Sequence, residues 1–189
     1  MVKYSARGAR EPYSESPAFP SLSSEDESPR RLQLQRVLKR HLEAFLKYVA
    51  PAQANSFLHR ATLMQQALHG RAPRALLLSI CAISSRFLSS ESTETEGSAE
   101  AHVWSCEATA LLALEGKICW ENVVAALVLA RHAIASGVYD KAWTLSAMAS
   151  RQALALGLHR ESPGLSWTIR EQRRRLMWAC FGLDCMMST

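Results

Sequence analysis

The sequence predicts an all-α fold, built as a multi-helix array of antiparallel helices. Leu and Ala dominate the middle of the chain, while Gly (8) and Pro (7) are scarce among the 189 residues. This balance favours helices over a sheet-rich fold. Apolar residues also recur at intervals of three and four, which is the spacing of one helical face. No segment alternates apolar and polar residues for the length of a strand.

The first expected helix follows a polar amino-terminal segment. Residues 1–29 are rich in Ser, Pro, Glu and Arg and poor in apolar residues, a composition that cannot offset the entropy cost of ordering. We therefore expect residues 1–29 to be a disordered linker and residues 30–189 to form the domain. Ser28 can cap a helix whose first position is Pro29, a favoured arrangement. Pro51 ends this helix.

Two further helices are expected in the next third of the chain. One spans about residues 62–68 and stops at Gly70, and the other spans residues 74–88 after Pro73. Residues 75–83 are apolar nearly all round, so they predict a central, buried helix.

Four helices are expected after a polar break at residues 89–97. Gly116, Gly137 and Gly157 follow three of them, where a left-handed residue commonly closes a helix. We expect the array to pack around the Leu77–Ile83 helix and the Ala142–Leu156 helix. The expected ranges of the four are 99–114, 120–136, 140–156 and 168 to the carboxyl terminus.

No catalytic or cofactor motif is recognisable. The chain lacks a Gly-rich phosphate loop, a nucleophile elbow and a His-Glu-x-x-His signature. Its five cysteines are irregularly spaced, with no Cys-x-x-Cys pair, which indicates neither a disulfide framework nor a zinc site. We expect these cysteines to be small buried residues in a reducing compartment. We therefore expect no enzyme and no catalytic, cofactor-binding or metal-binding residue.

The charge and hydropathy indicate neither a nucleic-acid-binding motif nor a membrane protein. The net charge of +5 attracts polyanions in general, but the basic residues are not gathered with aromatic partners into a nucleic-acid motif. No run reaches the roughly 20 apolar residues of a membrane-spanning helix, and no signal peptide follows Met1. We expect a soluble, intracellular protein with no membrane contact.

Residues 170–175, with the sequence Arg-Glu-Gln-Arg-Arg-Arg, form a dense charge cluster. Glu171 can pair with Arg174 and Arg175, three and four residues further on. Arg173 lies on the apolar stripe of its helix, so it must extend to solvent or find a partner. The cluster either binds phosphate or a partner, or fastens the start of the helix to its neighbours. The structural role is the favoured interpretation.

Three short segments share a pattern with one known family. In this order they resemble the fungal-specific transcription factor domain, the regulatory (middle homology) domain of fungal binuclear zinc-cluster transcription factors. The resemblance covers about residues 38–189. The matching residues are Phe57-Leu58-His59-Arg60, then Trp143, Arg151 and Gly157-Leu158-His159-Arg160, and then Glu171, Arg173-Arg174-Arg175, Trp178 and Asp184. The departures from the family pattern are Ala61, Leu63, Ala147, Met177 and Cys185.

The resemblance implies a regulatory domain in the nucleus of a fungus that controls transcription by RNA polymerase II. Family members bind DNA through an amino-terminal cluster of about six cysteines around two zinc ions, whereas no cysteine precedes Cys81 here. We expect zinc and DNA contact only in a cluster outside this chain. The family domain usually continues past Asp184, so we also expect the array to be truncated at its carboxyl terminus.

The motif residues are expected to be structural rather than catalytic. Leu158 can pack back on the helix it has left, and Trp178 and Phe181 can add apolar area to the contact of the final helix. The expected partners are other transcription proteins, a small-molecule effector or a second copy of the chain. The alternative is a helical scaffold or adaptor of the tetratricopeptide type, with a concave peptide-binding groove, cytoplasmic residence and no transcriptional role.

Overall fold

The computed structural model describes residues 29–51, 57–88 and 94–188, and every regular element in these ranges is a helix, as predicted. Ser28 and all but the last residue of the expected linker lie outside the described residues, so both expectations stay predictions. The elements are α1 (Pro29–Ala44), the π-helix η1 (Phe45–Val49), α2 (Arg60–Leu68), α3 (Arg74–Ser84), the 3₁₀-helix η3 (Ser85–Phe87), α4 (Glu94–Glu115), α5 (Trp120–Ala135), α6 (Tyr139–Ala155) and α7 (Trp167–Met187).

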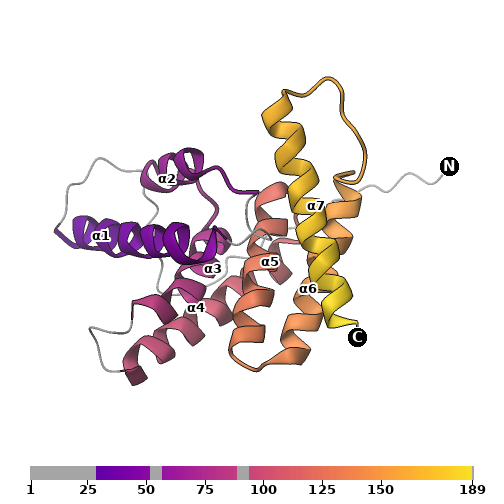
Figure 1. Ribbon diagram of the computed structural model, residues 1–189. Helices are drawn as coiled ribbons and strands as arrows, with labels where there is room; N and C mark the ends of the chain where they lie inside the picture. Colours follow the sequence, from indigo (N-terminus) through magenta and orange to yellow (C-terminus); the bar gives the residue numbers. More distant parts are fainter. Residues whose placement is uncertain (1–28, 52–56, 89–93, 189) are drawn as a thin grey trace, which may run out of the picture.

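The helices form two neighbouring groups that share one core (Figure 1). In the first group α3 packs against α1 and α4, and in the second group α6 packs against α5 and α7. The contact between α3 and α5 joins the two groups. Helix α7 therefore lies at the edge of the second group, where it crosses α6 and presents a face to solvent (Figure 1).

Helix α5 lies at the centre of the array. All residues from Val123 to Ala130 are at most 1% exposed, because α3 and α6 cover this helix from two sides. The prediction of a buried helix at residues 75–83 is confirmed, since Ala75 to Ser84 are all buried in α3. The prediction that the array also packs around the Ala142–Leu156 helix holds for the second group, where α6 contacts both α5 and α7. Helix α6 buries only one face, made mostly of Ala and Ser, and exposes the other.

Two histidines are buried in this core. The Nδ1 atom of His41 in α1 lies 2.8 Å from Ser84 Oγ. The His41 ring packs edge-to-face on the Trp104 ring. Burial, helped by the charge of Arg40, lowers the pKa of His41 to about 4. Burial likewise lowers the pKa of His132 in α5 to about 4. Both rings are therefore neutral near neutral pH.

The cysteines divide into two kinds. Cys81 and Cys180 are buried, and burial raises the pKa of each thiol to about 12, so the expected packing role is confirmed for these two. Cys106 and Cys185 are exposed and Cys119 is half-buried, so the expectation of burial is wrong for these three. In the described part of the chain, no helix combines the length and the apolar character needed to cross a bilayer.

Glycines close the helices where the sequence predicts them. Gly157 follows α6 with φ of 63°, in the left-handed region that favours glycine. The N–H of Leu158 then donates to Ala153 O at 3.0 Å, and the Leu158 side chain is buried. This confirms that Leu158 packs back on the helix it has left. The turn sends the chain toward α7.

Replacing Gly157 by Ala is expected to lower the free energy of unfolding by about 1–2 kcal/mol, the cost of a left-handed conformation for a residue with a Cβ. An added Cβ would meet no atom within 4 Å at Gly157 or at Gly164, so the cost comes from the backbone alone. Gly164→Ala is the matched control, because its φ lies outside the left-handed region. Urea unfolding measures both; equal stability of the two variants would contradict this account.

Candidate functional site

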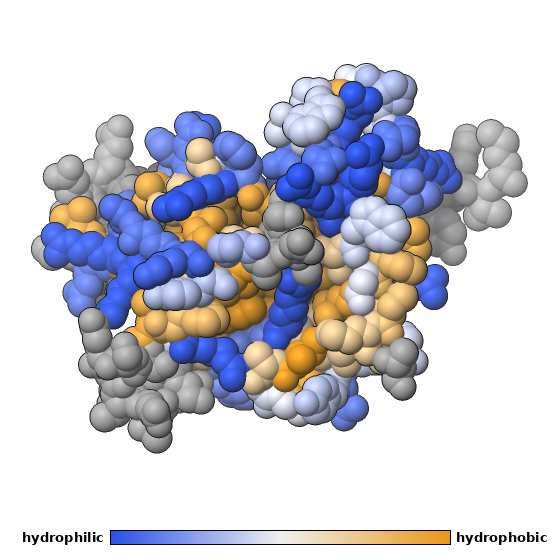
Figure 2. All heavy atoms as spheres, in the orientation of Figure 1, coloured by the Kyte–Doolittle hydropathy of each residue, from blue (hydrophilic) through white to orange (hydrophobic). Residues whose placement is uncertain are grey.

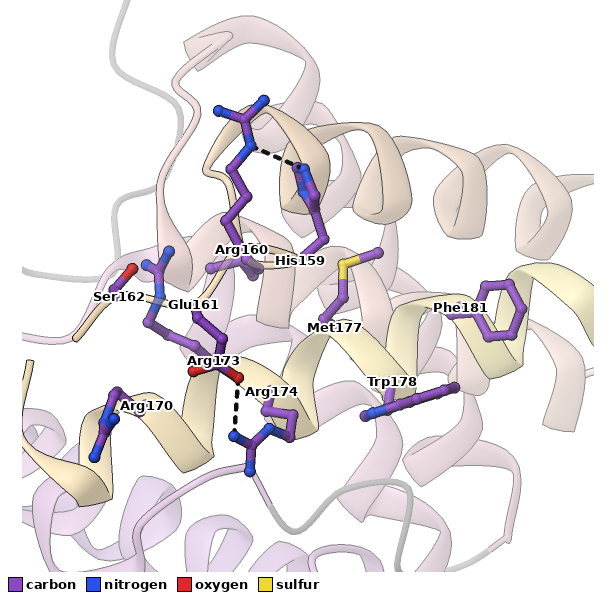
Figure 3. Close-up of a pocket in the computed structure, with 11 residues that line it drawn as sticks. His159, Arg160, Glu161, Ser162, Arg170, Arg173, Arg174, Met177, Trp178 and Phe181 are labelled. Atoms are coloured by element: carbon purple, nitrogen blue, oxygen red, sulfur yellow. Dashed lines mark hydrogen bonds and ion pairs between the residues drawn. The ribbon is translucent and has the colours of Figure 1, made fainter.

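A groove of about 310 Å³ lies between α7 and the segment that joins α6 to α7 (Figure 3). We call it the α6–α7 groove. Two of the three motif segments meet there, since both the residues after Gly157 and those of the charge cluster line it. The lining residues are Leu158, His159, Arg160, Glu161 and Ser162 from the joining segment and Arg170, Arg173, Arg174, Met177, Trp178 and Phe181 from α7.

Arg173 holds the two sides of the groove together. Its Nη2 donates to Leu156 O at 3.3 Å and to Gly157 O at 3.0 Å. These carbonyls end α6, where the helix carries partial negative charge. The partner that the sequence required for Arg173 is therefore the backbone of the preceding motif.

An ion-pair network orients the exposed arginines. Glu171 accepts from Arg174 at 2.9 Å and from Arg175 at 2.8 Å, as its spacing predicts, and Arg174 also donates to Glu161 at 3.0 Å (Figure 3). The hydrogen bond from Arg175 lowers the pKa of Glu171, and the hydrogen bond to Glu161 raises the pKa of Arg174. Such exposed pairs contribute little stability each, but they fasten the joining segment to α7. These pairings are the ones that the structural interpretation of the cluster expects.

Two donors in the groove have no acceptor. The Nε atoms of Arg170 and Arg173 are buried and form no hydrogen bond with any part of the chain that the structure describes. A buried unpaired donor costs free energy, more so when it belongs to a charged group. Both atoms belong to arginines that line the groove. Its lining charges are mainly positive, with four arginines against one glutamate.

The other wall of the groove is apolar. Met177, Trp178 and Phe181 line it, and the Trp178 and Phe181 rings meet edge-to-face with centroids 5.8 Å apart. The prediction that Trp178 and Phe181 add area to the contact of the final helix is wrong, because they are 66% and 52% exposed. The α7 positions Leu176, Cys180 and Leu183 face the core instead.

The first motif meets the start of α7 on another side. Phe57 is buried in the core, and His59 caps α2, where its Nδ1 accepts from the N–H of Thr62 at 3.4 Å. A smaller recess of about 160 Å³ lies between this segment and α7. Its lining residues are Phe57, Leu58, His59, Trp167, Thr168, Glu171, Gln172 and Arg175.

Five of the expected site residues, including Gly157 at the turn after α6, line neither hollow. Trp143 and Arg151 are on the exposed face of α6, Arg60 is exposed on α2, and Asp184 is half-buried near the end of α7. These residues do not join the others in a common site. The sequence did not single out Met177 as a wall of the groove or Arg170 as a residue with an unpaired donor, because both properties depend on tertiary neighbours.

Helix α7 has a second, more apolar hollow toward its carboxyl end. Figure 2 shows hydrophilic residues gathered over the amino-terminal half of α7 and more hydrophobic ones over the other half. The hollow has a volume of about 700 Å³ and lies between α5 and α7. The expected homodimer and the expected truncation of the array both stay predictions. The residues that line this hollow are Arg131, Ile134, Ala135, Arg175, Trp178, Ala179, Gly182, Leu183 and Met186.

Zinc coordination needs several Cys or His side chains around one point. Within residues 29–51, 57–88 and 94–188, no three His, Cys, Asp or Glu side chains are placed to hold a metal ion. These residues therefore do not fit a zinc cluster.

Comparison with known proteins identifies the family. The model of the fungal specific transcription factor domain matches residues 42–189. This chain belongs to that family. The match covers all residues of the α6–α7 groove, and membership favours the transcriptional interpretation over the helical adaptor.

Curated relatives of this family member are fungal transcription factors. The Zn(2)-C6 fungal-type transcription factor FTF1a of Fusarium oxysporum is 29% identical over 166 residues, which cover 79% of this chain and 15% of the relative. FTF2 of the same fungus is 30% identical over 70% of this chain and 14% of the relative. An uncharacterized transcriptional regulatory protein of Schizosaccharomyces pombe is 31% identical over 84% of this chain and 24% of the relative. The chain thus spans a quarter or less of these proteins, and no solved structure matches it.

Proposed function

We propose that this chain is the regulatory region of a fungal zinc-cluster-type transcription factor and that it modulates transcription by RNA polymerase II in the nucleus. Its family membership supports the regulatory role. The observation that carries the proposal further is the α6–α7 groove, where two motif segments form a cationic wall and an apolar wall around one hollow. Such convergence of a few polar groups with apolar side chains is typical of ligand and partner sites.

DNA contact and zinc belong, in this proposal, to a cysteine cluster outside the chain. The names of the Fusarium relatives carry the term Zn(2)-C6. The cysteines of this chain all lie from Cys81 onward and are dispersed over the helices. The regulatory region would then act on a DNA-binding domain through its surface.

A reporter assay tests the regulatory role. The chain is fused to a heterologous DNA-binding domain in a fungal host, and expression of a reporter with the matching DNA site is measured. We expect the fusion to change reporter expression relative to the DNA-binding domain alone. Replacing both Trp178 and Phe181 by Ala should remove most of this change, because it deletes the apolar wall of the groove.

Trp143→Ala is the matched control, since Trp143 is also an exposed tryptophan, at 57%, but lies outside the groove. It should leave reporter expression as in the unmodified fusion. A fusion that behaves like the DNA-binding domain alone would overturn the proposed function. An equal loss with Trp143→Ala would show that the groove is not the surface concerned.

A further inference from the structure

We propose that the carboxyl-terminal half of α7 is the contact surface of a homodimer, in which it packs antiparallel against the same half of α7 in a second copy of the chain. The surface is a row of exposed residues on the solvent side of α7 (Figure 1). We call it the α7 stripe, and its members are Trp178, Phe181, Gly182, Cys185 and Met186. The proposal goes beyond the proposed function, because a two-fold contact of this kind needs no transcriptional role.

The α7 stripe follows one face of the helix and carries no charge. Its members are spaced by three, one, three and one residues, the spacing at which side chains gather along one side of a helix. Every exposed residue of α7 from Trp178 to Met186 belongs to it. Trp178, Phe181 and Met186 are 66%, 52% and 56% exposed. Exposed apolar side chains that adjoin one another in this way mark contact surfaces for a partner.

Gly182 lies at the centre of the stripe, where the fold of the single chain does not need a glycine. A glycine inside a helix lowers the stability of the helix relative to alanine. An added Cβ at Gly182 would meet no atom within 4 Å, so the neighbouring helices do not explain the small residue. A second helix that crosses α7 at this point would explain it, because glycine allows close approach to the backbone.

The order of the stripe allows it to contact a copy of itself. In a two-fold interface each contact occurs twice, with the two copies exchanged. If the axis passes Gly182, Trp178 of one copy lies opposite Met186 of the other, since these residues are four positions before and after the glycine. The thioether of methionine makes favourable contacts with aromatic rings. The two glycines then meet where the helices cross.

The charges of α7 favour the antiparallel orientation. The amino-terminal half of α7, together with Glu161, which pairs with Arg174, carries four arginines against two glutamates. A parallel pair would place two such positive halves side by side, and like charges repel. An antiparallel pair places each of them near the carboxyl end of the other α7, which carries partial negative charge. The helix therefore complements a second copy of itself in charge as well as in apolar surface.

The area of the surface indicates a weak dimer. Aromatic side chains bury about 150–250 Å² each, so the exposed parts of Trp178, Phe181 and Met186 offer roughly 300–400 Å² per copy. The hollow of about 700 Å³ between α5 and α7 extends the surface over Ile134 and Ala135 of α5. Interfaces of standard size use about 800 Å² on each side. We therefore expect a dissociation constant on the order of 10–100 μM.

Sedimentation equilibrium of the purified chain over a range of concentrations tests the proposal. We expect monomer and dimer in reversible exchange. Trp178→Ala removes a central aromatic side chain and Met186→Glu places a charge in the contact, so each should weaken dimerisation at least about tenfold. Trp143→Ala is the matched control, because Trp143 is an exposed tryptophan of α6 outside the stripe. It should leave dimerisation unchanged.

Gly182→Leu separates loss of the contact from loss of the fold. Leucine favours a helix more than glycine does, and an added Cβ meets no atom of the single chain within 4 Å. The variant should therefore keep the helical circular dichroism spectrum. It should nevertheless weaken dimerisation about tenfold or more, because the added side chain holds the two helices apart.

Cross-linking at Cys185 tests the orientation. In the antiparallel pair the two Cys185 residues lie three positions beyond the axis on opposite sides, so they are offset by roughly 9 Å along the helices. A disulfide needs Cα atoms within about 7 Å of each other. A bismaleimide with a flexible hexane spacer should therefore join the two residues, whereas copper-catalysed oxidation should not. Cys185→Ser should abolish the cross-linked dimer.

Three results would overturn the proposal. A chain that stays monomeric well above the expected dissociation constant would assign the stripe to a different protein segment. A dimer that Trp178→Ala and Met186→Glu leave intact, or that Trp143→Ala weakens equally, would place the contact elsewhere. A disulfide between two Cys185 residues after oxidation would contradict the antiparallel orientation.

Discussion

Replacing Leu127 by Ala is expected to lower the free energy of unfolding by about 3 kcal/mol, within the range of about 2–5 kcal/mol for buried leucines. Leu127 is 0% exposed and lies in the middle of α5. Since α3 and α6 pack against α5 from two sides, the surrounding side chains cannot collapse fully into the space that the change leaves. Both helix groups should therefore lose stability together. Urea unfolding followed by circular dichroism measures the change.

Leu114→Ala is the matched control for this prediction. Leu114 lies at the end of α4 and is 80% exposed, so its removal should change stability by about 0.5 kcal/mol or less. Equal effects of the two substitutions would contradict the assignment of α5 as the central helix. A biphasic unfolding curve in the Leu127→Ala variant would contradict the single shared core.

Acidification from pH 6.5 to pH 4 is expected to destabilise the fold. Burial lowers the pKa of His41 and of His132 to about 4 in the folded state, while the unfolded chain has an ordinary histidine pKa near 6.5. Between these values the unfolded state binds protons that the folded state does not, so stability rises with pH. The contribution of the two neutral histidines to the free energy of unfolding should be complete above about pH 6.5 and lost below about pH 4. At about 1.4 kcal/mol per pKa unit, it is at most about 3–4 kcal/mol for each histidine.

The basic residues around the His41 and His132 rings lower the two pKa values further, in the same direction as burial. The charge of Arg40 opposes protonation of His41, and the charges of Arg86, Lys141 and His102 oppose protonation of His132. His132 Nδ1 also lacks a hydrogen-bond partner in the described residues. No carboxylate contributes to either pKa shift. We therefore expect no ion pair to stabilise the protonated form of either histidine.

The dependence of unfolding free energy on pH measures this effect through its slope between pH 4 and pH 6.5. His132→Gln should reduce the slope even if it lowers stability at every pH, because the titrating group is gone. His69→Gln, at an exposed histidine, should leave the slope unchanged. A slope that stays the same in His132→Gln would show that His132 is not the source of the acid sensitivity.

The amino-terminal half of α7 combines two roles that the sequence presented as alternatives. Arg173, Arg174 and Arg175 are engaged by the backbone of α6 and by two glutamates, which is the structural role. Arg170 belongs to the same cluster but keeps an unpaired buried donor. The cluster therefore fastens the groove, while one of its members, Arg170, lines the groove without a hydrogen bond at its Nε.

The sequence by itself determined the properties that depend on near neighbours along the chain. The helices, the glycine at the end of α6 and the pairing of Glu171 with Arg174 and Arg175 all follow from interactions within a few residues. The three motif segments also sufficed to indicate the family. The sequence predicted the helix ends less accurately, since α4 begins at Glu94 rather than near residue 99.

Only the tertiary structure decided which helix is central and which side chains remain exposed. Residues 120–136 and 140–156 are both helical and rich in alanine, but α5 is buried between α3 and α6, whereas α6 keeps one face exposed. Trp178 is large and apolar, yet it faces the groove because Leu176, Cys180 and Leu183 occupy the inner face of α7. The unpaired donors of Arg170 and Arg173 likewise depend on what lies across the groove. Hydrophobic burial and hydrogen bonding between distant segments are set by three-dimensional neighbours, which local sequence patterns do not encode.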